Sequence, residues 1–438
     1  MTPNDSQADI KTLLQFANQW WQDNVPPQSV AEAEQLVQAM SQQVAATMMS
    51  AALKQNSGRH SYQGVRLPCP CGGQAEFVSY RRRNLRTLCG EHRVQRAYYR
   101  CRQCGQGQLP WDAAQGLNRR LWTPAVKALA ADCCGRLTYG ETSQLLERLL
   151  NLPLEESSLE AVVAEVGDRL RAAEAEQITA VFDHLEQPKL APEVAGQPPE
   201  RLYIGIDAAK AHTGGSWHDV KCGVIYAAQP TAGQADQPQQ QHYLACQEEA
   251  AAFGRRLYAT ALGRGLAAAP QSVVIGDGAV WIWNLASEHF GDAIEILDYY
   301  HACEHLWTVA HSCYGEGSPA ARRWAKRRSK RLLEQGAGPL IESLCQRQAA
   351  TPEQQQLLAR ELAYFQRNRH RMRYPLFRKQ GLMIGSGPVE AACKVVVGQR
   401  LKGAGMRWTE PGADAMLAVR TAVLNDRPGQ LAQHAWAA

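Results

Sequence analysis

The run RLYIGID at residues 201–207 is an apolar strand that ends in an acid, and it decides how the second half of the chain is expected to fold. Four more strand-like runs follow it, at WHDVKCGVIYAA (217–228), QHYLACQ (241–247), SVVIGDG (272–278) and AIEILD (293–298). Helical patterns separate the third, fourth and fifth strands. Three consecutive strands followed by alternating helices and strands predict an α/β fold, in which helices cover both faces of a mixed five-stranded sheet.

Two acids end strands of this predicted sheet, Asp207 in the first and Asp277 in the fourth. Open α/β sheets place their reactive groups at the carboxyl ends of strands. If the two strands are neighbours, the carboxylates can meet, and a divalent cation would then relieve their repulsion. Oxygen ligands suit Mg²⁺ or Mn²⁺, and two such ions per site can activate an attacking oxygen and stabilise a leaving oxygen in phosphodiester chemistry.

A third acid, Glu390, stands in IGSGPVEAACKVVVGQRLKG (384–403). A proline suits the first turn of a helix, and a glutamate that follows it projects back towards the amino-terminal end. A lone glutamate at this place would merely favour the helix dipole. The same helix also carries Lys394, Arg400 and Lys402, which are positioned to hold a phosphate backbone.

Six blocks of this half resemble the DDE transposases of bacterial insertion sequences, and most closely their Kra-type group. The blocks are GIDAAK (205–210), GDGAVWIWN (276–284), LDYYHACEHLW (297–307), YFQRNRHRMRYPLF (364–377), MIGSGPVEAACK (383–394) and RLKGAGMRWTEPGADAMLAVR (400–420). The resemblance covers most of residues 201–427, and the cysteine region adds a weaker match. It implies a ribonuclease H-like catalytic core in which Asp207, Asp277 and Glu390 are the catalytic, metal-binding triad.

A D-x-x-H signature, Asp298 and His301, also resembles related transposase groups. Asp298 ends the fifth predicted strand and could compete with Asp277 as a metal ligand. We expect it instead to support the metal ligands, with His301 contacting DNA near the scissile phosphate. His305 is expected to be structural.

The interval between the second and third acids resembles the all-helical insertion of many DDE enzymes. It contains RRWAKRRSKR (322–331), in which seven of ten residues are basic. This block would face transposon-end DNA, although a solvated helix face is the alternative.

Tryptophans close to the acids have two interpretations. Trp281 and Trp283 are expected to pack in the core rather than to stack on bases. Trp408, beside Arg407, could stack on a flipped base or cap the core.

The cysteines form two close pairs, whereas most of the others are scattered singly and expected to be reduced. Pairs of thiolates on glycine-containing turns, separated by short strands, are typical of a zinc ribbon. The first pair departs from this pattern by its C-x-C spacing, so Cys89 or His92 could replace one of its members. The candidate Zn²⁺ ligands are Cys69, Cys71, Cys101 and Cys104.

Seven segments are expected along the chain. The helical segment that follows the cysteines resembles a helix-turn-helix, but two packed amphipathic helices would show the same pattern. The segments are a helical arm (1–60) for packing or self-association, a zinc-ribbon-like domain (61–115), a helix-turn-helix-like DNA-binding domain (116–185), a proline-rich linker (186–200), the first part of the catalytic core (201–310), a basic helical insertion (311–380) and the C-terminal core helices with the third acid (381–438).

Composition is that of an ordinary globular protein. The 438 residues correspond to about three domains, with 45% hydrophobic and 20% charged residues and a net charge of +5. No apolar run is long enough to span a membrane, and the amino terminus lacks the pattern of a secretory signal. A cytoplasmic, nucleoid-associated protein is expected.

The sequence therefore predicts a transposase that binds the terminal repeats of its element, cuts double-stranded DNA with Mg²⁺ and transfers the 3′-hydroxyl to target DNA. Two DNA ends must be handled together, so a homodimer or higher oligomer is expected. One alternative is a ribonuclease H-like, structure-specific endonuclease without strand transfer. The other is a DNA-binding regulator with a decayed core.

Overall fold

The protein forms two compact units. The computed structural model describes residues 15, 18–20, 22, 27–117, 122–182, 198–230 and 234–436. The first unit extends to Val126 and includes residues 150–152, and the second comprises residues 127–149 and 153–437. Most of the expected linker and part of the amino-terminal arm lie outside the described residues.

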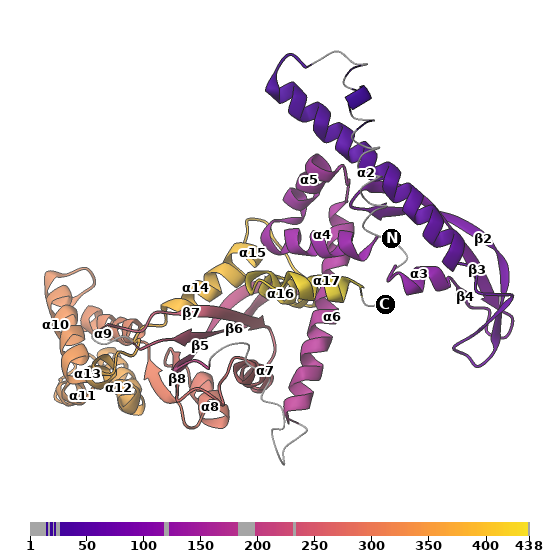
Figure 1. Ribbon diagram of the computed structural model, residues 1–438. Helices are drawn as coiled ribbons and strands as arrows, with labels where there is room; N and C mark the ends of the chain where they lie inside the picture. The colour runs from indigo at the N-terminus through magenta and orange to yellow at the C-terminus, as the bar shows by residue number, and fades with distance from the viewer. Residues whose placement is uncertain are drawn as a thin grey trace. The chain divides into compact units, whose positions relative to one another are not determined.

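The first unit is an antiparallel sheet with a long helix on it (Figure 1). Its strands follow one another in space as they do along the chain, because each is joined to the next by a tight turn. The elements are α2 (Val30–His60), β1 (Arg66–Pro68), β2 (Gln74–Thr87), β3 (Gly90–Cys101), β4 (Gly107–Gln108) and α3 (Pro110–Ala114). The helical arm therefore belongs to the same compact unit as the cysteine region.

From Glu91 to Arg96, side chains of β3 alternate between solvent and the helix, and beyond Ala97 residues of both faces are buried. The Oγ of Ser50 on α2 lies 2.8 Å from Nδ1 of His92. Arg96 is also buried, and its guanidinium donates two hydrogen bonds of 2.7 Å to the carboxylate of Asp112 on α3. The charge of Arg96 is thus neutralised where it is buried.

Three helices precede the second sheet: α4 (Pro124–Arg136), α5 (Tyr139–Leu150) and α6 (Glu156–Phe182). The stretch NLP (151–153) lies in the connection between α5 and α6. The first half of α6 buries its apolar face against α16 (Glu410–Leu424). Gly167 makes this approach possible, because a Cβ there would collide with the backbone of Ala415.

The second unit contains the predicted mixed five-stranded sheet. Its strands are β5 (Arg201–Thr213), β6 (Ser216–Ala228), β7 (Gln239–Cys246), β8 (Gln271–Gly276) and β9 (Ile294–Leu297), in the spatial order β7-β6-β5-β8-β9. The first three pair antiparallel, β8 pairs parallel to β5, and β9 pairs parallel to β8. Two helices intervene, α7 (Ala250–Gly263) and α8 (Val280–His289).

The first strand is longer than expected, so Asp207 lies inside β5 rather than at its end. A hairpin with two glycines of positive φ, Gly214 and Gly215, joins β5 to β6 and lets their ladder continue to Thr213. The ladder between β5 and β8 stops earlier, at the pair of Ile206 and Gly276.

Residues between β9 and the third acid are helical, as predicted for the insertion, and end in a 3₁₀ turn and a short helix. These elements are α9 (Tyr299–Tyr314), α10 (Pro319–Gln335), α11 (Gly338–Cys345), α12 (Pro352–Arg367), η1 (Arg369–Arg371) and α13 (Tyr374–Lys379). The chain then forms α14 (Gly387–Ala392), the π-helical η2 (Cys393–Gly398), α15 (Gln399–Leu401), α16 and α17 (Pro428–Trp436). Among the described residues, no helix has the length and apolarity needed to cross a membrane.

Candidate functional site

Asp207 and Asp277 lie together at the carboxyl end of the β5–β8 ladder. Each directly follows one member of the last β5–β8 pair, so the parallel register brings the two residues to the same level. Asp207 Oδ1 accepts a hydrogen bond of 2.7 Å from the amide of Ala208, and Asp277 Oδ1 accepts one of 2.7 Å from that of Ala279. Burial and the Asp277 carboxylate raise the pKa of Asp207, although the Ala208 amide lowers it. The two acids therefore repel each other electrostatically.

Glu390 is on α14, which packs against β5 and β6. Gly205 permits this packing, because a Cβ there would lie 3.1 Å from Cβ of Val389. The Oγ of Ser386 donates a hydrogen bond of 2.7 Å to Oε1 of Glu390. The Sγ of Cys393, one turn beyond Glu390, lies 3.5 Å from Oδ2 of Asp207. The helix with the third acid thus reaches the carboxylate of the first.

Asp298 connects three parts of this site. It is fully buried and caps α9, with Oδ1 accepting a hydrogen bond of 2.6 Å from the amide of His301. Its Oδ2 accepts one from the amide of Ser386, and its own amide donates to the carbonyl of Gly276 at 2.8 Å. The carboxylate of Asp298 bonds the start of α9 and the loop before Glu390, and its amide bonds the end of β8. Asp298 therefore holds these three segments together.

The three acids do not form a compact set of ligands. In the part of the chain that the structure describes, only four cysteines form a group of three or more potential ligands whose donor atoms all lie within 4.8 Å of one another. A Mg²⁺ or Mn²⁺ site at Asp207, Asp277 and Glu390 therefore stays a prediction.

His301 is half-buried on the first turn of α9. Burial lowers its pKa, but the carboxylates of Asp298, Glu304 and Asp277 raise it above the ordinary value for histidine. Its Nδ1 lies 3.1 Å from a carboxylate oxygen of Glu304. The negative surroundings of His301 thus favour its charged form.

The side chain of His305 is held by the insertion. Its ring stacks on Tyr364 with 3.6 Å between ring centroids, and its Nδ1 is hydrogen-bonded to the buried carboxylate of Glu361. Tyr364 in turn packs against Gly278, where a Cβ would collide with the phenol ring. Through these contacts α12 supports the loop that carries Asp277.

Sequence reasoning did not single out Ser386, Cys393 or Tyr364. A serine four residues before Glu390 is a signal that could have been noticed, because such spacing allows a side-chain bond near a helix start. No local signal marks the cysteine or the tyrosine, whose partners lie far away in the sequence.

The basic residues near the third acid differ in exposure. Lys394 and Arg407 are exposed, but Arg400 is only 2% exposed and its Nε donates a hydrogen bond of 2.7 Å to the carbonyl of Cys134. This burial contradicts the expectation that Arg400 faces DNA. The sequence could not show it, because the partner lies on α4.

The tryptophans are packed. Trp283 is buried in the core and Trp281 packs against it, which confirms their interpretation as core residues. Trp408 is half-buried, its Nε1 donates to the carbonyl of Leu401 at 3.3 Å, and the guanidinium of Arg400 lies 5.0 Å from its ring centroid. Of the two interpretations of Trp408, these contacts favour packing over base stacking.

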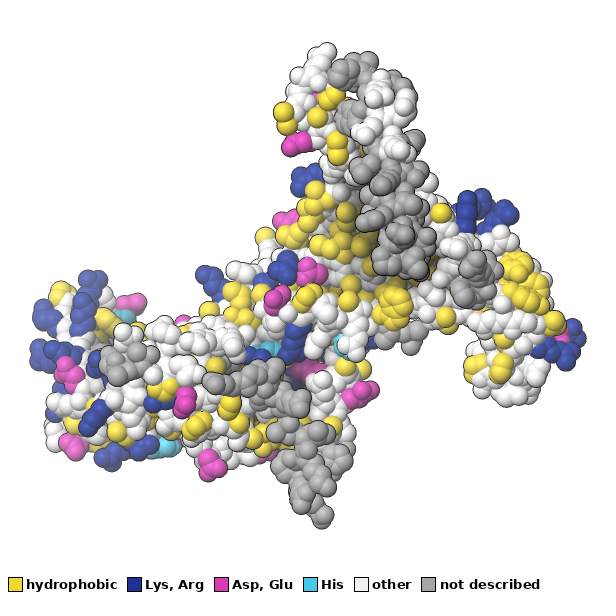
Figure 2. Space-filling view, in the orientation of Figure 1, with side chains coloured by type: hydrophobic (Ala, Val, Ile, Leu, Met, Phe, Trp, Pro, Cys, Tyr) yellow, Lys and Arg dark blue, Asp and Glu magenta, His cyan; other side chains and the backbone are white. Residues whose placement is uncertain are grey.

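The basic block forms most of α10. The helix buries Ala321, Ala325 and Leu332 on one face and exposes its arginines and lysines on the other. Figure 2 shows dark-blue side chains gathered over this helix. The exposed basic residues are Arg322, Arg323, Lys326, Arg327, Lys330 and Arg331.

The first unit holds the compact group of four cysteines. The Sγ atoms of Cys69 and Cys104 lie 3.6 Å apart, and those of Cys71 and Cys101 lie 3.7 Å apart. Tetrahedral ligation with Zn–S bonds of ~2.3 Å requires sulfur separations of ~3.8 Å. The cluster can therefore bind a metal such as zinc, and the C-x-C spacing does not prevent it.

Two similar turns present these cysteines. The amide of Gly72 donates to the carbonyl of Cys69 at 2.9 Å, and that of Gly105 to the carbonyl of Cys101 at 3.0 Å. Both glycines have positive φ. The amides of Cys104 and Gln103 help to lower the pKa of the Cys101 thiol to about 7, which favours its thiolate. The Gly73 amide lowers the pKa of Cys71, but the thiols of Cys104 and Cys69 raise it to about 12, so in the absence of a cation Cys71 holds its proton.

The alternative ligands Cys89 and His92 are outside this group. Both ring nitrogens of His92 are occupied, Nδ1 by Ser50 and Nε2 by the carbonyl of Cys89 at 3.2 Å. Two cysteine turns brought together by β2 and β3 hence form the candidate metal centre without them.

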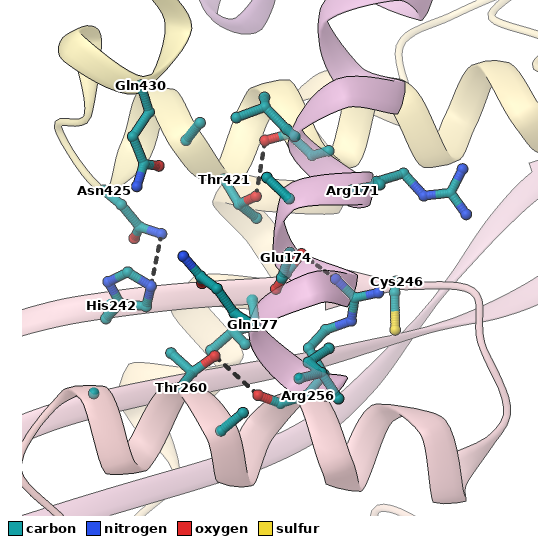
Figure 3. A pocket seen from close by; sticks show the side chains of 18 of the residues that line it. Arg171, Glu174, Gln177, His242, Cys246, Arg256, Thr260, Thr421, Asn425 and Gln430 are labelled. Carbon is teal, nitrogen blue, oxygen red and sulfur yellow. Dashed lines mark hydrogen bonds and ion pairs between the residues drawn. The ribbon is translucent and has the colours of Figure 1, made fainter. Parts of the chain in front are cut away.

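A cavity of about 740 Å³ lies beside β7, the strand at one edge of the sheet. Residues of α6, α7, α16 and α17 also line it. Figure 3 shows Arg256 reaching Glu174 within it. Arg256 also bonds Glu248 at 2.7 Å, so its buried charge is compensated. None of Asp207, Asp277 and Glu390 lines this cavity.

Comparison of the chain with models of protein families gives no match, and comparison with curated proteins finds no similar sequence.

Proposed function

We propose that this protein is a transposase that binds double-stranded DNA at insertion-sequence ends, cuts it in a Mg²⁺-dependent reaction and joins the new 3′-hydroxyl to target DNA. One observation carries the proposal. Asp207 and Asp277 each follow one residue of the last β5–β8 pair. Cys393 connects the helix of Glu390 to Asp207, and Asp298 connects the start of that helix to Gly276, next to Asp277. The mixed five-stranded sheet supports the ribonuclease H-like core that the sequence blocks imply.

The three acids fit a cation by their chemistry, because carboxylate oxygens are the ligands that Mg²⁺ prefers. Asp207, Asp277 and Glu390 would hold two Mg²⁺ ions, which would supply activation of an attacking oxygen and stabilisation of the leaving oxygen. The raised pKa of Asp207 supports this assignment, since burial and the neighbouring Asp277 carboxylate make a cation at this place favourable.

Basic residues around the acids would position the DNA. Lys394 is exposed one turn beyond Glu390, and His301 lies in the field of Asp277 with a raised pKa. Both would contact phosphate oxygens near the scissile bond, and the exposed face of α10 would bind the backbone further away. Simultaneous handling of two ends requires at least a dimer of this chain.

The test is a cleavage assay with labelled duplexes that correspond to the DNA on either side of the gene. With Mg²⁺, the wild-type protein should produce end-specific nicks followed by joined products. Asp207→Asn, Asp277→Asn and Glu390→Gln should each lower cleavage by at least about a thousandfold, comparable with the loss of other catalytic groups that act as a unit, and each should retain DNA binding.

Asp292→Asn is the matched control, because Asp292 is an exposed acid in the turn before β9. It should cleave like the wild type. Nicking of any branched or hybrid substrate without joined products would replace the proposal by a structure-specific endonuclease. Binding without metal-dependent cleavage would replace it by a DNA-binding regulator.

A further inference from the structure

The positive charge of the protein is concentrated in the cysteine unit. Residues 61–115 contain nine arginines, no lysine and three acids, which give a net charge of +6. The whole chain carries +5, so the rest of the molecule is nearly neutral. A domain with such an excess of arginine has the electrostatic footprint of a protein that binds nucleic acid.

Most of these arginines lie on the β2–β3 ribbon, a two-stranded antiparallel ladder that runs from the pair of Ala75 and Cys101 to that of Thr87 and Gly90. At ~3.4 Å per residue, the 12 residues of β3 extend over ~40 Å. One face of the ribbon is covered by α2, which buries His92, Val94 and Arg96. The opposite face, the outer face, is open at Tyr80, Arg82, Asn84, Arg93 and Gln95, whereas nearer the cysteines Ala97 and Tyr99 on the same face are buried beneath Leu67 and Phe77.

The outer face carries long polar side chains at successive positions. Tyr80 and Arg82 on β2 are exposed, and so are Gln95, opposite Arg82, and Arg93 on β3. Within the described part of the chain, neither Arg82 nor Arg93 forms an ion pair. By contrast, Arg66 and Arg102 pair with Glu76 near the cysteine cluster.

We propose that the outer face of the β2–β3 ribbon is a DNA-binding surface that enters the major groove of B-form DNA. The major groove, ~12 Å wide, admits a two-stranded β-ribbon. Arginine and glutamine are the side chains that most often bond guanine and adenine edges there, and the remaining arginines can contact phosphates.

The surrounding structure holds the ribbon in shape. The cysteine cluster joins the turns at one end, and the bonds of Arg96 to Asp112 anchor the covered face. A bound metal would make that end rigid. The outer face is therefore presented without the ordering cost that a disordered basic tail would incur on binding.

This inference rests on the proposed function in one respect, that DNA is the substrate, and it adds the surface that recognises it. The test uses the full chain and a mixed-sequence B-DNA duplex without Mg²⁺, in buffer free of chelator so that any cysteine-bound metal remains. Arg82→Gln with Arg93→Gln should weaken binding at least about tenfold and reduce the slope of log affinity against log salt by about 2, the value for two lost phosphate or base contacts.

The matched control is Arg66→Gln with Arg102→Gln, which removes the same charge from the same unit but from arginines already paired with Glu76. It should bind within about threefold of the wild type, because these two arginines share Glu76 near the cysteine cluster and do not belong to the row of Arg82 and Arg93. Equal metal content and circular dichroism establish that both double variants fold.

Three outcomes would overturn the inference. The first is unchanged affinity and salt dependence in the Arg82/Arg93 variant, and the second is an equal loss in the control. The third is tighter binding to double-stranded RNA, whose deep and narrow major groove excludes a β-ribbon. Binding lost only in the outer-face variant, without cleavage by the wild type, would sustain this surface and reject the transposase.

Discussion

Asp298 shows how much of this site depends on one buried side chain. Its carboxylate accepts hydrogen bonds from two backbone amides in segments that are 85 residues apart, those of His301 and Ser386. A buried amide left without an acceptor costs about 1–3 kcal/mol, and a lost helix cap costs about 1 kcal/mol. The residue therefore links the stability of the fold to the position of Glu390.

Asp298→Ala should lower the free energy of unfolding by about 2–4 kcal/mol, measured by urea denaturation followed by circular dichroism. It should also abolish cleavage in the assay described above, because the loop before Glu390 loses its anchor. Asp292→Ala serves as the control, since that acid is exposed. A variant as stable as the control would show that the carboxylate holds nothing in place.

His242, on β7, makes stability depend on pH (Figure 3). Burial lowers its pKa to about 3, and the positive charges of Arg427 and Arg264 lower it too. The histidine of the unfolded chain takes up a proton near pH 6.5, whereas the folded one stays neutral until about pH 3. Unfolding thus becomes easier as the pH falls between these values, by up to about 1.4 kcal/mol per pH unit for this one proton.

His242→Gln should flatten the pH dependence of the unfolding free energy between pH 6.5 and pH 5, relative to the wild type. His218→Gln is the control, because the side chain of His218 is 43% exposed. Denaturant titrations at several pH values provide the measurement. Parallel curves for the wild type and His242→Gln would mean that His242 is protonated in the folded protein as readily as in the unfolded chain.

At the scale of elements, close backbone approaches determine how helices meet the sheet and one another. Gly205 lets α14 approach β5, and Gly167 lets α6 lie against α16. The π-helical η2, which follows the turn of Glu390, leaves the carbonyl of Val395 free to accept two hydrogen bonds from Arg420 of α16. Such π-helical turns occur frequently at functional sites.

Gly167→Ala should lower the free energy of unfolding by about 1–3 kcal/mol, because the new methyl group forces α6 away from Ala415. Gly429→Ala on α17 is the matched control. Nothing lies within 4 Å of a Cβ at Gly429, so the same change should be neutral or stabilise by up to about 1 kcal/mol. Thermal and urea denaturation of both variants measure the difference, and equal effects would contradict the close contact of the two helices.

At the scale of the whole molecule, the two units differ in what stabilises them. The second unit has a large continuous core around the sheet. The first has small clusters, one of which includes Cys69 and Cys101 themselves. A metal at the cysteine cluster would supply the first unit with stabilisation that its small core lacks.

Removal of metal with a strong zinc chelator should therefore unfold the region around the cysteines and leave the second unit folded. Hydrogen exchange should increase in residues 61–117 only, and elemental analysis should find one metal ion per chain before treatment. Cys101→Ser with Cys104→Ser should behave like the chelated protein, whereas Cys89→Ser should keep its metal. Full protection of 61–117 without metal would show that the unit folds on packing alone.

The amino-acid sequence by itself determined the strands and helices around RLYIGID, the mixed five-stranded sheet and the two cysteine pairs as candidates for a metal, whereas the structure excluded Cys89 and His92 from that group. These features depend on alternation, apolar runs and short spacings, which neighbouring residues set. It also placed Trp281 and Trp283 in the core, since large apolar side chains on a helix beside a buried strand are most stable against that strand.

Only the tertiary structure decided which polar groups are buried and which are presented to a partner. In the folded protein, Arg400 points inward and bonds Cys134, and β5 continues beyond Asp207. Asp298 bonds Ser386. One face of the β2–β3 ribbon is covered, whereas Arg82 and Arg93 remain exposed. Each of these outcomes depends on a partner distant in sequence, or on a neighbouring strand or helix that packs on one face only. Local patterns carry no information about such partners, and long-range packing therefore determines the site.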